Sequence, residues 1–157
     1  MLLSKSAQSV QDALSKKGMT AKVVELPAST RTAEDAAAAI GCQVAQIAKS
    51  LIFRTKRSNK PILVLASGIN RVNEKIIAST VGEEIVKADA DFTREVTGFA
   101  IGGIPPIGHK LQIETYIDED LLKYKELWAA AGTPNAVFSL DSASIENLTG
   151  GKIISIK

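Results

Sequence analysis

Two features of the sequence have residue types and spacing suited to chemistry: a lysine at the start of an apolar run, and a loop rich in glycine and proline. Lys49 comes directly before "SLIF" (residues 50–53), where core residues would partly desolvate its amine. Desolvation lowers the pKa of an amine and makes it responsive to bound anions or carbonyls. The alternative is a lysine whose charge reaches water from the end of the strand. Lys49 is the first candidate for a binding or catalytic cation.

The second feature is "GFAIGGIPPIGH" (residues 98–109), which holds four glycines and two adjacent prolines. Glycine lets a backbone approach a ligand closely, and proline fixes φ and gives up its N–H donor. Together they make a stiff segment with few side chains, suited to the wall of a binding site. The alternative is a bulge or tight turn at Gly102 and Gly103, with the prolines ending a strand.

Several other chemistries lack the residues they need. The chain has one histidine, His109, and one cysteine, Cys42, with no spacing of paired metal ligands, so we expect no metal. It has no G-x-S-x-G elbow, no P-loop and no G-x-G-x-x-G after a strand, so we expect neither a serine triad nor a nucleotide cofactor. Cys42 follows Gly41 at an expected helix end, which favours a buried structural thiol over a nucleophile.

A group of cations, Arg54, Lys56, Arg57 and Lys60, follows the apolar run that begins after Lys49. Such a group usually forms the solvated tip of a hairpin. It could also contact phosphates, weakly and with strong dependence on salt.

The elements that must position these residues alternate irregularly, which favours an α+β fold with a mixed sheet. Residues 48–55 and 61–67 are expected to form a central hairpin, because both are apolar and a polar turn joins them. The other expected strands are 21–26, 83–88, 111–117, 126–132, 135–140 and 151–157. The expected helices are 5–17, 33–40 with Thr32 as cap, 74–81 with Asn73 as cap, 91–96 opened by Asp91, 118–124, and 143–149 capped by Asp141 or Ser142.

The bulk composition is that of an ordinary globular domain. The 157 residues are 45% hydrophobic and 23% charged, so we expect one domain over residues 1–157. The N-terminus has too few apolar residues for a secretion signal, no run reaches membrane length, and one cysteine forms no internal disulfide. A cytoplasmic location is therefore expected. The net charge of +2 does not by itself indicate nucleic-acid binding.

Four ordered stretches carry a resemblance to a known family: "IAKSLIF" (47–53), "PILVLASGINRVNEKIIAS" (61–79), "GFAIGGIPPIGH" (98–109) and "AGTPNAVFSLDSASIENLTGGKI" (131–153). Together they resemble the YbaK family, the free-standing relatives of the editing (insertion) domain of bacterial prolyl-tRNA synthetase. The resemblance implies a single mixed α/β domain with a curved, barrel-like sheet surrounded by helices.

The resemblance also implies an activity. Members of this family are trans-editing deacylases, which hydrolyse the ester between a wrong amino acid and the 3′ end of a tRNA, assisted by the substrate and without a metal or a protein nucleophile. The implied partners are mischarged aminoacyl-tRNA and, as a second candidate, prolyl-tRNA synthetase; neither DNA nor a membrane is expected. Two alternatives stay open: a non-catalytic module that binds tRNA or a synthetase, and a hydrolase of another small acyl ester.

Site residues follow from the same resemblance. The family's conserved lysine corresponds to Lys49, and its G-x-x-P loop corresponds to Gly102 through Pro105, extended by Pro106 and Gly108. Backbone N–H groups freed by glycine are suitable donors to an oxyanion. The catalytic candidates are thus Lys49, Gly102 and Gly103, and the substrate-binding candidates are Ile104, Pro105, Gly108, His109 and Thr133. For His109 we favour a role in stabilising the loop or at the edge of the substrate over that of a general base.

The amino acid removed is left open among alanine, cysteine, serine and threonine. Some relatives specific for Cys-tRNA carry a tyrosine shortly after the first strand and a "GG" pair where this chain has Gly132 and Thr133. This chain has neither, so cysteine specificity is not carried over. A hydrophobic pocket separates such small side chains by only roughly 1–3 kcal/mol.

Overall fold

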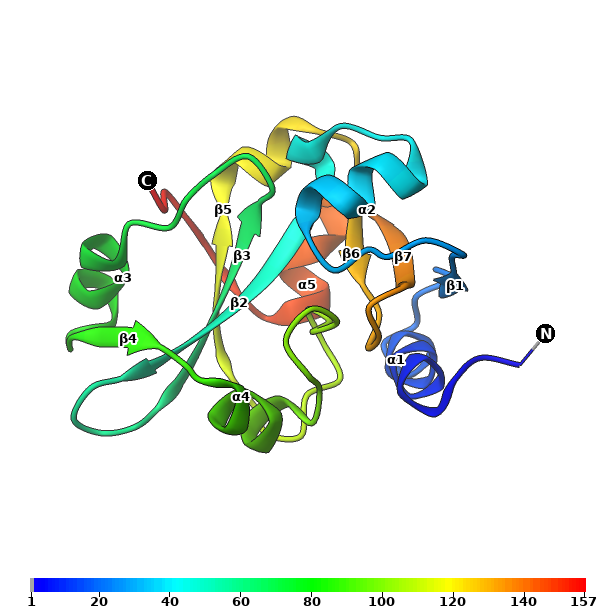
Figure 1. The fold of residues 1–157 in the computed structure, drawn as a ribbon. Helices are drawn as coiled ribbons and strands as arrows, with labels where there is room; N and C mark the ends of the chain where they lie inside the picture. The colour runs from blue at the N-terminus through cyan, green and yellow to red at the C-terminus, as the bar shows by residue number, and fades with distance from the viewer. Residues whose placement is uncertain (1) are drawn as a thin grey trace.

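The computed structural model describes residues 2–157, which form two β-sheets with helices around them (Figure 1). The larger sheet has the strand order β4-β2-β3-β5-β8 and the smaller one the order β1-β7-β6. The large sheet contains β2 (Ala48–Thr55), β3 (Pro61–Ser67), β4 (Ile85–Lys87), β5 (Glu114–Asp118) and β8 (Lys152–Ile154). The small sheet contains β1 (Val24–Glu25), β6 (Glu126–Ala130) and β7 (Ala136–Asp141). The helices are α1 (Lys5–Lys16), α2 (Ala33–Ile40), α3 (Glu74–Val81), α4 (Ala90–Thr97) and α5 (Ile145–Thr149).

The large sheet is mixed, as expected. Strands β2 and β3 form the predicted antiparallel hairpin, with Lys49 opposite Ala66, and β4 is antiparallel to β2. Strand β5 runs parallel to both β3 and β8. The mixed α/β class is therefore confirmed. The expectation of a barrel-like sheet needs correction, because the two sheets do not close on each other and one isolated bridge, Ile47 to Trp128, links them.

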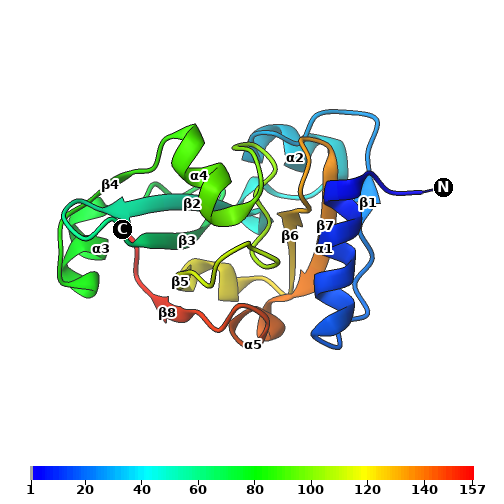
Figure 2. The same ribbon diagram turned by 90° about the horizontal axis from the view of Figure 1, so that it is seen from below.

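The large sheet is covered on both faces because its central strands are apolar throughout. On one face Ile62 and Val64 pack with Phe53 and with Ile77 of α3. The other face carries the larger core, which Leu63 and Leu65 share with α1 and with the small sheet. Figure 2 shows α3 at one end of the molecule and α1 lying along β7 at the other.

The helix starts follow from local hydrogen bonds. Thr32 Oγ1 accepts from Asp35 N at 3.1 Å, and Asn73 Oδ1 accepts from Lys75 N at 3.1 Å, which confirms both predicted caps. Helix α4 starts earlier than expected, because Asp89 rather than Asp91 is its cap, with Oδ1 accepting from Phe92 N at 2.8 Å.

Several strands are shorter than the sequence suggested, because some of their backbone N–H and C=O groups bond to a side chain or to a helix instead of a neighbouring strand. In residues 21–26, Gln11 Nε2 donates to Ala21 O and Gln11 Oε1 accepts from Val23 N. Only Val24 and Glu25 of this segment therefore pair as a strand, β1. In residues 111–117, Leu111 N donates to Val96 O at 3.1 Å, which ties this segment to α4 and delays β5 to Glu114.

The short helices near the C-terminal half also differ in type. Residues 119–123 form a 3₁₀ helix (Glu119–Lys123) rather than an α-helix. Asp141 caps a further 3₁₀ turn, Ser142–Ser144, which leads into α5. The final strand is confined to β8. Among residues 2–157, no helix combines the length and the apolar character needed to cross a bilayer.

Candidate functional site

Lys49 lies where two cavities meet. The first cavity has a volume of ≈ 410 Å³ and the second ≈ 560 Å³. Both are lined by the start of β2 and by the glycine loop, through Lys49, Ser50, Leu51, Ile101 and Ile104. The two candidate features of the sequence therefore face each other across one site.

Five alanines lie on the wall of the first cavity, beside larger apolar side chains such as Ile40, Leu51 and Trp128. Ala33 and Ala36 of α2, Ala48 of β2, and Ala129 and Ala130 of β6 lie on its wall. Because these side chains are short, the space between α2, β2 and β6 stays open. The cavity also has charged groups at Arg31 and Glu34, so it can hold a small polar ligand with both a positive and a negative end.

The Lys49 amine has a lowered pKa. Burial is the main cause; the positive charge of Arg71 adds to the lowering, while the carboxylates of Glu34 and Asp118 oppose it. Lys49 is half-buried. The structure thus favours the desolvated lysine over one whose charge reaches freely into water.

Ser50 was not predicted from the sequence. Its Oγ is buried without a hydrogen-bond partner anywhere in residues 2–157, and the residue lines both cavities. Unpaired buried hydroxyls are costly and point to a strained or ligand-binding site. No motif marks a serine of this kind, because its missing partner becomes visible only in three dimensions.

The backbone of Ser50 also faces open space. Ile52 O accepts from Ala88 N at 3.1 Å, so the backbone groups of Ile52 point away from β3. Backbone groups alternate along an antiparallel strand, so those of Ser50 point the same way. Strand β4 pairs only with Phe53, Arg54 and Thr55, and therefore leaves this edge of β2 uncovered at Ser50.

Some residues of the glycine loop line the first cavity, and others pack against the rest of the chain. Gly102 and Ile104 line the first cavity, and their contact with substrate stays a prediction. Gly103 lies behind them: its N–H donates to Ala100 O at 3.2 Å, and its carbonyl accepts from Gly132 N at 2.8 Å. A Cβ on Gly103 would lie 2.8 Å from the backbone of Thr133. The expected role of the Gly103 amide as a donor to the ester stays a prediction.

This close approach predicts different effects for the two glycines. Gly103→Ala is expected to destabilise the fold by about 2 kcal/mol, because backbone atoms of Thr133 must move to admit the methyl group. In Gly102→Ala the new Cβ meets the Arg31 side chain, which can move, at 2.8 Å, and φ of +102° adds strain. Thermal unfolding and deacylation should separate them: Gly103→Ala loses more stability, Gly102→Ala more activity. The reverse order would contradict this assignment.

The remaining predicted site residues lie outside both cavities. Pro105, Gly108, His109 and Thr133 are not on either wall. His109 Nε2 is 2.7 Å from Pro105 O and donates to it, which fixes the turn of the loop. Burial lowers the pKa of His109, and the bond to Pro105 opposes that effect. Thr133 Oγ1 donates to Asn135 Oδ1 at 2.9 Å. Contact of these residues with substrate stays a prediction.

Two of the hairpin cations are paired within the chain, and Cys42 is only partly buried rather than fully buried as expected. Lys56 pairs with Glu84 at 3.5 Å, and Lys60 pairs with Glu114, so two of the four hairpin cations are compensated within the chain. Burial raises the pKa of Cys42, which disfavours a reactive thiolate.

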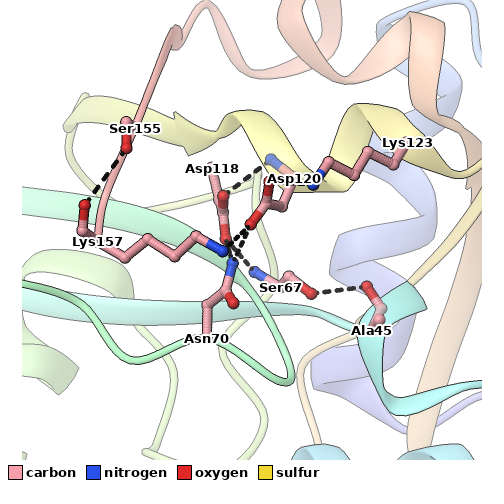
Figure 3. Close-up of polar contacts among 8 residues, drawn as sticks. All are labelled: Ala45, Ser67, Asn70, Asp118, Asp120, Lys123, Ser155 and Lys157. Carbon is pink, nitrogen blue, oxygen red and sulfur yellow. Dashed lines mark hydrogen bonds and ion pairs between the residues drawn. The ribbon is translucent and has the colours of Figure 1, made fainter.

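A network of hydrogen bonds and ion pairs surrounds the Asp118 carboxylate, next to the turn that follows β3 (Figure 3). Asp118, only 1% exposed, accepts from Ser67 N at 2.9 Å, from Asn70 Nδ2 at 2.8 Å and from Asp120 N at 2.9 Å. Asp120 in turn pairs with Lys157 at 2.8 Å. These bonds hold the turn after β3, which carries Gly68 to the first cavity and Arg71 to the second.

The aminoacyl-tRNA editing domain family matches residues 27–148, and the chain belongs to this family.

Three relatives support this assignment. A solved structure described as that of a proposed trans-editing enzyme for prolyl-tRNA synthetase is 47% identical, with a TM-score of 0.93 over 99% of both chains. EbsC of Enterococcus faecalis, proposed to be a Cys-tRNA(Pro)/Cys-tRNA(Cys) deacylase, is 28% identical over 80% of this chain and 76% of its own. Proline–tRNA ligase of Limosilactobacillus fermentum is 35% identical over 57% of this chain but only 16% of its own. The predicted class, a trans-editing aminoacyl-tRNA deacylase, is confirmed.

Proposed function

We propose that the protein removes a small, wrongly attached amino acid from tRNA for proline, and that the ester is held beside Lys49. The observation that carries this proposal is the position of Lys49 at the junction of two cavities, one of which has five alanines on its wall. The wall suits a side chain of the size of alanine, cysteine, serine or threonine. The choice of tRNA is supported by the two relatives described as a proposed trans-editing enzyme for prolyl-tRNA synthetase and a proposed Cys-tRNA(Pro) deacylase.

The amino acid would enter the first cavity with its ammonium group toward Glu34. Glu34 is the carboxylate on this wall, and Arg31 and Lys49 are its cations. An α-ammonium group beside Glu34 would leave the ester carbonyl near the start of β2, where the Lys49 charge is half-buried. Charges placed in a partly desolvated site act more strongly than in water.

Hydrolysis then needs a water molecule and donors for the oxyanion. The water oxygen forms a bond to the carbonyl carbon, and the bond from that carbon to the ribose oxygen breaks. The ribose oxygen takes up the proton that the water loses, and the neighbouring ribose hydroxyl orients the water. In our proposal the oxyanion is stabilised by the Lys49 ammonium and by the backbone N–H groups of Ser50 and Gly102.

Ser50 gives a specific prediction. Ser50→Ala is expected to lower kcat/KM about tenfold, because the buried hydroxyl would lose its bond to the bound ester. The unfolding temperature should stay the same or rise, because the hydroxyl has no hydrogen-bond partner within residues 2–157. Ser9→Ala on the exposed face of α1 is the matched control. An unchanged kcat/KM, or a clear loss of stability, would show that the Ser50 hydroxyl serves the fold and not the ester.

The activity itself is tested with a panel of mischarged tRNAs. Release of alanine, cysteine, serine or threonine from tRNA for proline, at enzyme levels that leave Pro-tRNA(Pro) intact, is the expected result. Binding of tRNA without release would identify a non-catalytic module instead. We further propose that the protein works in the cytoplasm beside prolyl-tRNA synthetase, and a pull-down with the purified synthetase tests that partner.

A further inference from the structure

Two loop segments close one side of the first cavity. The segment that leads into α2 contributes Thr30, Arg31 and Thr32, and the glycine loop contributes Ile101, Gly102 and Ile104. The two segments meet at Arg31 and Gly102, because a Cβ built on Gly102 would lie 2.8 Å from Arg31 Cγ. The position of Arg31 relative to Gly102 therefore decides how much space the cavity has on this side.

Both segments are bound to the same turn, residues 131–135, which joins β6 to β7. On one side, Leu26 N donates to Asn135 O at 2.8 Å, and Thr30 N donates to Pro134 O at 2.6 Å. The Thr30 hydroxyl, on a residue only 5% exposed, donates to the same Pro134 carbonyl at 3.0 Å. On the other side, Gly132 N donates to Gly103 O at 2.8 Å. The turn thus holds the two segments relative to each other.

The side chain of Asn135 uses both ends of its amide in this arrangement. Its Oδ1 accepts from Thr133 Oγ1 at 2.9 Å, within the turn. Its Nδ2 donates to Leu26 O at 3.0 Å, across to the segment before α2. A primary amide accepts at one end and donates at the other, which suits these two bonds. Asn135 itself lies outside both cavities, so any effect on the ligand must pass through its neighbours.

We infer that Asn135 is a positioning residue, which fixes Arg31 against Gly102 and thereby limits the size of the amino acid that the first cavity accepts. The limit on size rests on the proposed function, whereas the placement of the two segments does not. The competing interpretation is that Asn135 serves only to fold the turn between β6 and β7. Asn135 would then affect stability and leave the choice of amino acid unchanged.

Asn135→Asp is the test, because it keeps the shape of the side chain and replaces the donor to Leu26 O by a carboxylate oxygen. The segment before α2 should then move away from the glycine loop. Hydrolysis of Pro-tRNA(Pro), relative to that of the best small amino acid, is expected to rise about tenfold in kcat/KM, the effect of one methylene group in a closely fitting pocket.

Asp141→Ala is the matched control. Asp141 lies at the other end of β7, where its Oδ1 accepts from Ala143 N at 2.9 Å, so this variant also loses a hydrogen bond of the same hairpin. It should lower the unfolding temperature and leave the relative hydrolysis of Pro-tRNA(Pro) as in wild type. If Asn135→Asp likewise lost stability without any change in this ratio, Asn135 would serve the fold alone and the inference would be wrong.

NMR spectra of the free protein separate this inference from the proposed function. The amide signals of Arg31 and Gly102 should shift in Asn135→Asp and stay in place in Asp141→Ala. Unchanged signals at both residues in Asn135→Asp would overturn the inference even in an active enzyme. Shifted signals in a protein that releases no amino acid would uphold the placement of the two segments while the proposed function fails.

A milder variant covers the case in which Asn135→Asp does not fold. Thr30→Val keeps the shape of the side chain and the backbone bond to Pro134, and removes only the bond from the hydroxyl. The same shifts at Arg31 and Gly102 and a smaller rise in the relative hydrolysis of Pro-tRNA(Pro) are expected. Spectra and hydrolysis identical to those of wild type would contradict the role of the turn.

Discussion

Lys49→Ala should reduce deacylation at least about a hundredfold, because it removes the half-buried positive charge at the junction of the two cavities. Single charged or donor groups that stabilise an oxyanion typically contribute about 10²–10³ in kcat. The fold should survive, since the Lys49 amine has no ion-pair partner among residues 2–157 whose charge would be left unpaired. Single-turnover hydrolysis of mischarged tRNA, with circular dichroism as the check on folding, measures both effects.

Lys49→Arg is the informative control for this charge. The guanidinium keeps the positive charge but is planar and longer in reach, so it should restore only part of the activity. If Lys49→Ala hydrolysed the ester at the wild-type rate, the ester would have to lie elsewhere. The two cavities would then be no more than gaps beside the edge of β2.

Asp118→Ala should be the most damaging substitution for stability among those considered. It removes a carboxylate that is 1% exposed and leaves the buried donors Ser67 N and Asp120 N without their partner. Breaking a buried charged network costs about 3–5 kcal/mol. For a chain of this length, that corresponds to a fall in Tm of roughly 6–20 °C. Thermal unfolding at neutral pH measures it.

Asp141→Ala provides the matched comparison. Asp141 is exposed and caps one turn, with Oδ1 accepting from Ala143 N at 2.9 Å. Loss of such a cap costs about 1 kcal/mol. Equal effects at Asp118 and Asp141 would mean that the buried network contributes no more than an ordinary cap. A further expectation is that Asp118→Asn, which keeps the shape, lies between the two.

Lys49 and Gly102, which the sequence singled out as candidates, line one cavity in the structure, and both were found from local patterns. Lys49 precedes an apolar run that had to be a strand, and Gly102 lies in a segment that no helix would accept. The order of the elements could be predicted as well, since caps such as Thr32 and Asn73 act within one turn of the chain.

The rest of the site depends on contacts between distant parts of the chain. Among residues 2–157, Ser50 stands out because its buried hydroxyl has no hydrogen-bond partner. Within the same residues Arg71 has no carboxylate at ion-pair distance, whereas Lys56 and Lys60 each have one. A sequence shows which groups are present but not which of them are paired. The same limit explains the strand expected at residues 21–26, where the side chain of Gln11 occupies backbone groups that a neighbouring strand would otherwise have used.

Hydrolysis of alanine, cysteine, serine or threonine esters of tRNA for proline, compared between wild type and Lys49→Ala, tests the central claim most directly. We predict that wild-type protein releases at least one of these amino acids, that it spares Pro-tRNA(Pro), and that Lys49→Ala releases at least about a hundredfold less. Equal release by the two proteins would contradict the role of Lys49. No release from any of these tRNAs by wild type would contradict the proposed substrate.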